Sequence, residues 1–251
     1  MKLEVCVDSV ESSIAAARGG AERIELCSAL SEDGITPSAG LIDIVRKCVE
    51  IDVFVIIRPR GGSFVYSEHE LKVMRSDIAA ARSWGVNGVV LGLLNEEGMI
   101  DRPHTTELIE LARPMEVTFH RAFDASRNHA EALEDVIACG ADRLLTAGGS
   151  SDAMNNLDSL AALQGQAGGR IRIMAGGGIR IGNVHEVAML TGIGEVHTSL
   201  NSKAQNSAYD GGAGPGAVRD SGCYVVQESD VQAFKAVLHE IGMRSSAKPR
   251  V

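Results

Sequence analysis

Short apolar runs recur along the chain, and each is followed by a longer stretch with helical periodicity. Four of these runs come a few residues after a glycine that would end the preceding helix, at Gly20, Gly85, Gly140 and Gly192. Glycine readily adopts the left-handed conformation that ends a helix, and an unbroken apolar run is typical of a strand buried on both faces. The pattern therefore predicts strands that alternate with helices.

Four further apolar runs bring the number of predicted strands to eight. They lie at residues 3–7, 53–58, 116–120 and 171–175. Successive strand starts are separated by roughly 20 to 34 residues, close to the ~30 that a strand–helix–strand unit requires. Strict alternation over eight units predicts an α/β fold, a single-domain (βα)8 TIM barrel. An open doubly wound sheet is the alternative, but the strong phosphate-binding fingerprint expected near its start is missing.

Serine residues mark the predicted starts of several helices. Ser9, Ser38 and Ser67 each precede a helical stretch, and Glu70 stands where a capping box with Ser67 requires a carboxylate.

After the eighth strand the alternation of strands and helices ends, because residues 201–222 are rich in Gly, Ser and Asn. We expect a long flexible loop there, followed by a closing helix over 230–241. The barrel domain is predicted over 1–243, with a C-terminal tail at 244–251.

Composition and charge exclude several classes of protein. The 251 residues carry 24 Lys and Arg against 33 Asp and Glu, a net charge of −9, and the basic residues are scattered. A nucleic-acid partner is therefore not expected. The longest apolar run, 53–57, is far shorter than the ~20 residues of a membrane helix, so we expect no membrane partner and a cytosolic protein. Five cysteines without a C-x-x-C pair argue for free thiols.

Two of the cysteines lie on the first two predicted strands. Side chains alternate along a strand, so Glu4 shares a face with Cys6, and Glu25 shares a face with Cys27. We expect these faces to point into the barrel, because an unpaired carboxylate in the helix layer is costly. The two thiols would then occupy matching positions on adjacent strands, with backbones ~4.8 Å apart.

Thiols at that separation have two interpretations. Thiolates in a site with few ligands select Cu(I), whereas tetrahedral zinc needs two more Cys or His ligands, of which His120 is one candidate. Alternatively, both cysteines simply pack, since buried free cysteine behaves as a small hydrophobic residue. The residues alone leave both interpretations open. No ligand role is assigned to Cys48, Cys139 or Cys223.

A second group of polar side chains is predicted at or just beyond the strand ends. It comprises Glu4, Glu25, Arg58, Arg60, His120, Asp124 and His197. Of these, Glu25, Arg58 and His120 are the candidate catalytic residues, because carboxylate, guanidinium and imidazole groups together suit acid–base chemistry on a small anionic molecule. The alternative is a structural plug in which Glu and Arg pair with each other.

Three consecutive glycines follow the seventh predicted strand. Gly176, Gly177 and Gly178 lie where many barrels bind phosphate through backbone N–H groups. We therefore predict an anion site at these glycines, with a tight turn as the alternative.

Four stretches of the sequence carry a resemblance to a known family. They are 4–9, 21–30 with 34–38, 57–62 and 118–124, and they resemble the CutC copper homeostasis protein family. The resemblance extends from Leu3 to about Thr198. It implies a (βα)8 barrel and a homo-oligomer, dimer or tetramer, in the cytoplasm, with the nucleus as a second candidate compartment. In animal members, which this sequence resembles especially, two cysteines are implicated in Cu(I) binding, and they correspond to Cys6 and Cys27.

Two functions are therefore predicted. The first is a cytosolic Cu(I)-binding protein of copper homeostasis, with Cys6 and Cys27 as the metal ligands. The alternative is a TIM-barrel enzyme of unknown reaction that acts on a small phosphorylated or carboxylated substrate.

Overall fold

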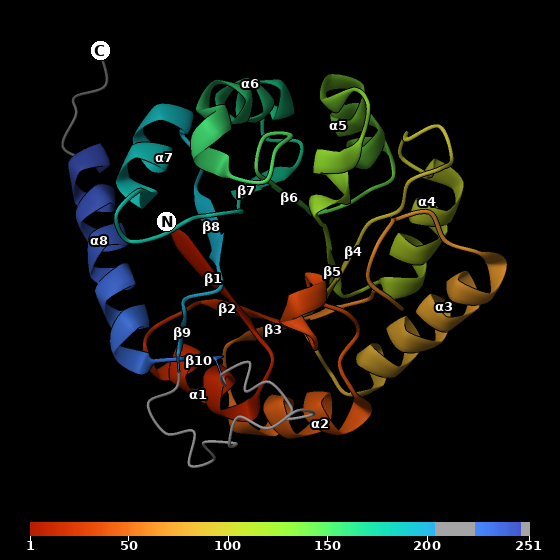
Figure 1. Ribbon diagram of the computed structural model, residues 1–251, viewed down its shortest axis with the longest axis horizontal. Helices are drawn as coiled ribbons and strands as arrows, with labels where there is room; N and C mark the ends of the chain where they lie inside the picture. The colour runs from red at the N-terminus through yellow and green to blue at the C-terminus, as the bar shows by residue number, and fades with distance from the viewer. Residues whose placement is uncertain (204–223, 247–251) are drawn as a thin grey trace, which may run out of the picture.

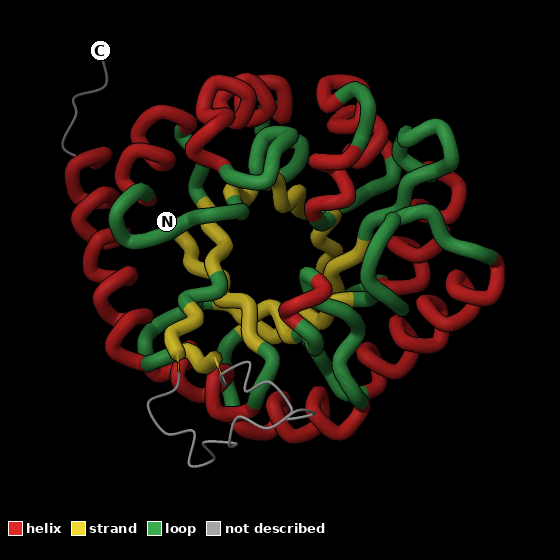
Figure 2. The backbone as a smooth tube through the Cα atoms, in the orientation of Figure 1, coloured by secondary structure: helices red, strands yellow, loops and turns green. Residues whose placement is uncertain are grey.

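Eight parallel strands close into a barrel surrounded by helices (Figures 1 and 2). The computed structural model describes residues 1–203 and 224–246. The barrel strands are β1 (Lys2–Val7), β2 (Arg23–Leu26), β3 (Asp52–Ile56), β4 (Gly88–Leu91), β5 (Glu116–Phe119), β6 (Arg143–Thr146), β7 (Arg172–Ala175) and β8 (Glu195–Thr198). They follow one another around the barrel in chain order, and β8 pairs with β1. The prediction of a (βα)8 barrel is confirmed.

Helices alternate with these strands. They are α1 (Val10–Arg18), α2 (Ala39–Cys48), α3 (Glu68–Ser83), α4 (Arg102–Ala112), α5 (His129–Ala138), α6 (Leu157–Ala167), α7 (Val184–Thr191) and α8 (Glu228–Ser246). Short 3₁₀ helices occur at η1 (Leu30–Glu32), η2 (Arg121–Ala125) and η3 (Ala153–Asn156). None of the helices in the described ranges is long and apolar enough to cross a membrane.

Three of the predicted helix starts depend on serine caps. The side chains of Ser9, Ser38 and Ser67 accept hydrogen bonds from backbone N–H groups in the first turns of α1, α2 and α3. At α3 the Glu70 carboxylate also accepts from the Ser67 N–H at 2.7 Å, which completes the capping box. Each cap satisfies an amide that lacks a partner within its helix.

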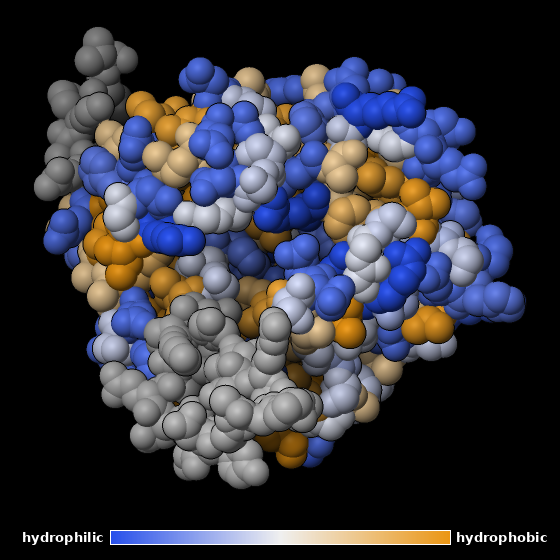
Figure 3. All heavy atoms as spheres, viewed as in Figure 1, coloured by the Kyte–Doolittle hydropathy of each residue, from blue (hydrophilic) through white to orange (hydrophobic). Residues whose placement is uncertain are grey.

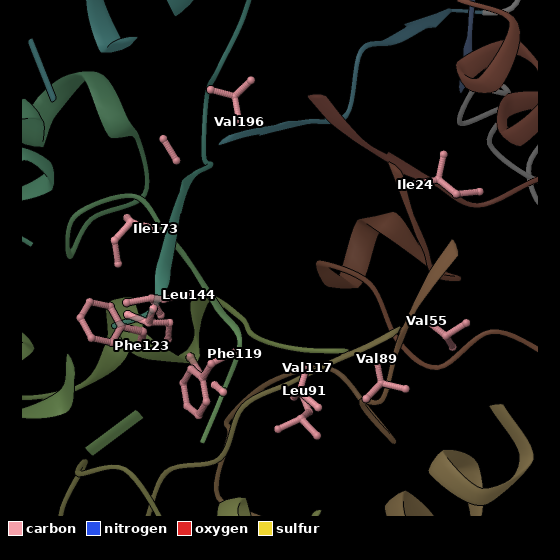
Figure 4. Packing of buried hydrophobic residues seen from close by; sticks show 14 of the residues in the cluster. Ile24, Val55, Val89, Leu91, Val117, Phe119, Phe123, Leu144, Ile173 and Val196 are labelled. Carbon is pink, nitrogen blue, oxygen red and sulfur yellow. The ribbon is translucent and has the colours of Figure 1, made fainter. Parts of the chain in front are cut away.

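The main hydrophobic core lies between the strands and the helices (Figure 4). One face of each strand supplies it, with side chains such as Ile24, Val55, Val89 and Val117 that are fully buried. The residues between them point into the barrel, so the alternation expected along a strand holds. Burial of these branched side chains against the helices fixes the strand faces, and with them the set of residues available inside the barrel.

Deep inside the barrel the interior is ionic. Arg143 is fully buried, and its Nε atom lies 2.6 Å from Oε2 of Glu195, which also accepts from Arg23 at 2.8 Å. Arg23 pairs in turn with Glu4. Buried charges are tolerated only when they are paired and hydrogen-bonded, which these are. The network is a structural plug of paired Glu and Arg residues, the alternative predicted from the sequence. Of the side chains predicted at the mouth, however, only Glu4 takes part in these ion pairs.

The end of the chain differs from its predicted form at two places. Residues Asn201–Lys203 form β9, which pairs antiparallel with β10 (Tyr224–Val226), so a short ribbon borders the predicted loop of 201–222. Val226 is buried, and its N–H donates to Ser12 Oγ of α1, which holds the ribbon against the barrel. Helix α8 continues to Ser246, into the predicted tail of 244–251. The rest of both predicted segments lies outside the described residues.

Candidate functional site

A cavity of about 1000 Å³ opens at the carboxyl ends of the barrel strands. Its wall includes Cys6, Glu25, Arg58, His120 and His197, which come from five different strands or the loops after them. The space-filling view along the barrel shows a hollow over the centre of the barrel (Figure 3). This is the end of a (βα)8 barrel where binding and catalytic groups are found.

The sulfur atoms of Cys6 and Cys27 lie 3.7 Å apart. This distance is too long for a disulfide bond, and both thiols are free. The expectation that the two cysteines occupy matching positions is wrong, because the strand register pairs Cys6 with Glu25. Cys27 lies two residues beyond Glu25, towards the carboxyl end of the barrel, and its N–H donates to Val7 O. Its side chain therefore reaches Cys6 diagonally.

The environments of the two thiols differ. Cys6 lines the cavity, whereas Cys27 is fully buried behind it, among Phe54, Ile56 and Val90. Cys27 therefore fills an apolar gap as well as contacting Cys6. Of the two cysteines, only Cys6 lines the cavity.

A cluster of potential metal ligands forms around Cys6. The Cys6 sulfur, a Glu25 carboxylate oxygen and a ring nitrogen of His197 all lie within 4.8 Å of one another. Cys6 and Glu25 are neighbours in the β1–β2 register. His197 joins them because β8 pairs with β1 to close the barrel, which places His197 opposite Glu4. His197 was predicted at the mouth but not as a metal ligand. Its inward position on the last strand, next to the first strand of a closed barrel, is the signal that could have identified it.

A contact with the buried Glu4 carboxylate holds the His197 ring in one orientation. Its Nδ1 atom lies 2.7 Å from Oε1 of the buried Glu4, and its Nε2 atom lies 3.7 Å from Oε2 of Glu25. A histidine that donates its far N–H to a carboxylate presents the other nitrogen as a ligand, which is the usual arrangement in metal sites. Glu4 was predicted at the mouth, but the structure places it one layer below, because its side chain pairs with Arg23 in the plug.

Burial and mutual contacts shift the proton affinities of the cluster. The contact with Cys27, burial and the nearby Glu25 carboxylate all raise the pKa of Cys6 well above its usual value. Burial also raises the pKa of Glu25, against the opposing charge of His197. Burial would lower the pKa of His197, but Glu25 and Glu4 outweigh it and the pKa is raised. The pKa of Glu4 is about 2, because Arg23 and His197 overcome the effect of burial.

Arg58 and His120 belong to a different part of the wall. The guanidinium of Arg58 lies 5.1 Å from the ring centre of Phe64, and the centre of the His120 ring lies 5.1 Å from the same point. Of the three candidate catalytic residues, Glu25 therefore belongs to the group of potential metal ligands around Cys6, whereas Arg58 and His120 form a separate group. All three residues nevertheless line the same cavity.

Two other predicted mouth residues have structural roles. Asp124 lines the cavity, but its oxygens accept from Thr146, from the N–H groups of Ala147 and Gly149, and from Arg121. Arg60 does not line the cavity. It turns outward to Glu70 at 2.5 Å and to backbone carbonyls of its own loop, because the capping carboxylate of α3 lies within reach there.

Two of the three glycines predicted as an anion site reach the cavity. Gly177 and Gly178 line it, both with positive φ, whereas Gly176 donates its N–H to Thr146 O and lies behind them. A Cβ on Gly178 would meet the Asp152 carboxylate at 2.6 Å. That carboxylate places negative charge beside the turn, which does not favour an anion at Gly178 itself.

The fold and the site together define a (βα)8 barrel with a thiol, a carboxylate and an imidazole gathered at its mouth. A sequence profile of the CutC family matches residues 1–202 of this chain. The human copper homeostasis protein cutC homolog is 48% identical over 200 residues, which cover 80% of this chain and 73% of the human protein. A CutC family protein of Chromobacterium violaceum is 45% identical over 239 residues, 94% of this chain and 96% of the other.

A solved structure agrees with this assignment. The putative copper homeostasis protein CutC of Streptococcus agalactiae superimposes with a TM-score of 0.75 at 31% identity, covering 78% of this chain and 97% of that one. The chain belongs to the CutC family.

Proposed function

We propose that this protein serves copper homeostasis by binding Cu(I) at the mouth of its barrel. The thiolates of Cys6 and Cys27 are the principal ligands, and Nε2 of His197 is a third. The observation that carries the proposal is the convergence of these groups, with sulfur atoms 3.7 Å apart and the imidazole within 4.8 Å of Cys6. The names of the human and Streptococcus agalactiae relatives point to the same role.

The ligand set fits a soft ion. Thiolate sulfur and imidazole nitrogen suit Cu(I), and the apolar residues around Cys27 keep competing water away. A carboxylate such as Glu25 is a harder ligand and would be expected in a zinc site as well. Zinc is therefore the metal against which the proposal has to be tested.

Glu25 has a second role in the proposal. A thiol must lose its proton before it binds a metal ion, and the raised pKa of Cys6 makes that loss costly. The pKa of the Glu25 carboxyl is also raised, and Glu25 lies beside the Cys6 sulfur. Glu25 is thus placed to take up the proton that Cys6 gives up when the ion binds and to pass it on to the solvent.

The test is an anaerobic Cu(I) titration of the full chain in competition with a chromogenic chelator. We expect one ion per chain, and a loss of about 100-fold or more in affinity in the Cys6→Ser variant, at least as large as the loss from removing a residue that supports a ligand. The His197→Asn variant keeps a donor toward Glu4 but removes the Nε2 ligand, so a smaller loss is expected. Cys48→Ser removes an exposed cysteine at the end of α2 and is the matched control.

Two results would overturn the proposal. One is unchanged stoichiometry and affinity in a folded Cys6→Ser, Cys27→Ser double variant. The other is a preference for zinc over Cu(I) under the same reducing conditions.

The proposal also includes the compartment and the assembly. Free thiols in contact persist in a reducing environment, which supports a cytoplasmic location. A homo-oligomer, dimer or tetramer, remains a prediction that a mass measurement in solution tests directly.

A further inference from the structure

The second part of the cavity wall, formed by Arg58, Phe64 and His120, contains a hydrogen-bond donor without an acceptor. The Nδ1 atom of His120 accepts from the Ala122 N–H at 3.1 Å. In the neutral ring the proton is therefore on Nε2. Within the described ranges no atom accepts from Nε2, although His120 is only 5% exposed. A buried donor left without an acceptor is unfavourable, because it has lost the hydrogen bond that water would have given it.

Arg58 beside it is a buried cation without a counter-charge. Its two terminal nitrogens donate to the carbonyl oxygens of Glu32, Gly34 and Gly62, and its Nε has no partner. In the part of the chain that the structure describes, no carboxylate forms an ion pair with this guanidinium, which is 3% exposed. The carbonyl oxygens satisfy its terminal nitrogens but leave its charge uncompensated, so this wall favours a negative group.

The cavity has room for more than an inorganic ion. Its volume of about 1000 Å³ lies at the upper end of the range of small-molecule sites. Apolar side chains, among them Leu30, Ile56 and Leu145, line it between the polar groups. A few convergent donors in a largely apolar concavity are characteristic of sites for organic ligands.

We propose that the cavity binds a small organic anion whose carboxylate or phosphate group accepts a hydrogen bond from His120 Nε2 and faces Arg58. The site is separate from the Cys6, Glu25 and His197 cluster and does not depend on copper. Burial and the charge of Arg58 lower the pKa of His120 to about 3, so the ring is a neutral donor at physiological pH. Phe64 fixes the relative positions of the two groups from one side.

Calorimetric titration of the metal-free full chain tests this site. Succinate and glycerol 3-phosphate are the two probes, at constant ionic strength, and succinamide and glycerol are their uncharged counterparts. We expect one of the charged probes to bind and neither uncharged compound to do so. Which probe binds distinguishes a carboxylate site from a phosphate site.

Paired variants at His120 locate the contact. His120→Asn keeps an acceptor for the Ala122 N–H but has no donor at the Nε2 position, whereas His120→Gln can place an N–H there. We expect His120→Asn to weaken binding at least about tenfold, the effect of losing one hydrogen bond to a charged group, and His120→Gln to retain most of it. Arg58→Gln should also weaken binding at least about tenfold. Arg170→Gln, which removes an exposed charge, is the control and should bind as the unaltered protein does.

The proposal fails if neither charged probe binds at about 10 mM, a concentration that would detect millimolar affinity. It also fails if binding is the same in a folded His120→Asn variant. If that variant does not fold, the Nε2–H resonance of His120 in the unaltered protein decides, because a bound probe must shift it.

Discussion

Nδ1 of His197 lies 2.7 Å from Oε1 of Glu4, although the two residues are 193 positions apart in the sequence. Closure of the barrel between β8 and β1 makes them neighbours. The contact connects the ionic interior to the potential metal ligands Cys6, Glu25 and His197, because Glu4 also pairs with Arg23. Glu4 is thus a positioning residue for the imidazole that faces Cys6.

Replacement of Glu4 tests that positioning role. Glu4→Gln removes the charge that holds the His197 ring, and we expect Cu(I) affinity to fall about 10–100-fold while one ion per chain still binds. Glu195→Gln is the matched control, since it removes another partner of Arg23 without touching His197. Equal effects of both variants on Cu(I) affinity would show that the loss reflects general destabilisation. Competition titrations and urea unfolding of both variants separate the two effects.

Cu(I) affinity should rise with pH. The pKa of Cys6 is raised, so near neutral pH the thiol is protonated and each binding event releases its proton. Affinity therefore increases about tenfold per pH unit for each proton displaced, and it levels off only above the thiol pKa. Titrations between pH 6 and pH 8 in buffers of different ionisation enthalpy measure both the slope and the protons released. An affinity that does not change over this range would argue against Cys6 as a ligand.

His120 makes the fold less stable in mild acid. Its pKa is about 3 in the folded protein, against about 6.5 in an unfolded chain, so the unfolded state binds more protons between these values. The contribution of neutral His120 to the free energy of unfolding is therefore fully present above about pH 6.5 and is lost as the pH falls towards 3. Between pH 7 and pH 5 the loss from this group is about 2 kcal/mol.

Unfolding by urea at both pH values measures this loss. In the His120→Asn variant the decrease between pH 7 and pH 5 should be smaller by about that amount. His69→Asn, which removes an exposed imidazole on α3, is the control. The explanation is wrong if both variants follow the pH dependence of the unaltered protein.

The buried ion pairs of the barrel interior should matter far more than the surface pairs. Arg143 is fully buried and contacts Glu195, Glu116 and Thr118. Arg143→Gln leaves the Glu195 carboxylate with one partner fewer, and we expect a loss of about 3–5 kcal/mol in the free energy of unfolding. Removal of the exposed Arg170–Glu134 pair should have a far smaller effect, because solvent screens it. Similar losses in the two variants would contradict this assignment.

The sequence by itself determined the architecture and much of the inventory of the site. Eight apolar runs, four of them after helix-ending glycines, predicted all eight barrel strands, because strands buried on both faces are apolar throughout. Serine caps predicted the starts of α1, α2 and α3, since a cap is a local interaction. Alternation along the strands predicted that Glu4, Cys6 and Glu25 face the barrel interior, which the buried ion pairs and the cavity confirm.

Only the tertiary structure decided which of these side chains meet. Alternation gives the face of a strand but not its register with the next strand, and the register places Cys6 beside Glu25 while Cys27 reaches it diagonally. Barrel closure, which no local pattern encodes, brought His197 to Glu4, Cys6 and Glu25. The unpaired donor of His120 likewise became visible only once every neighbouring acceptor had a position in space.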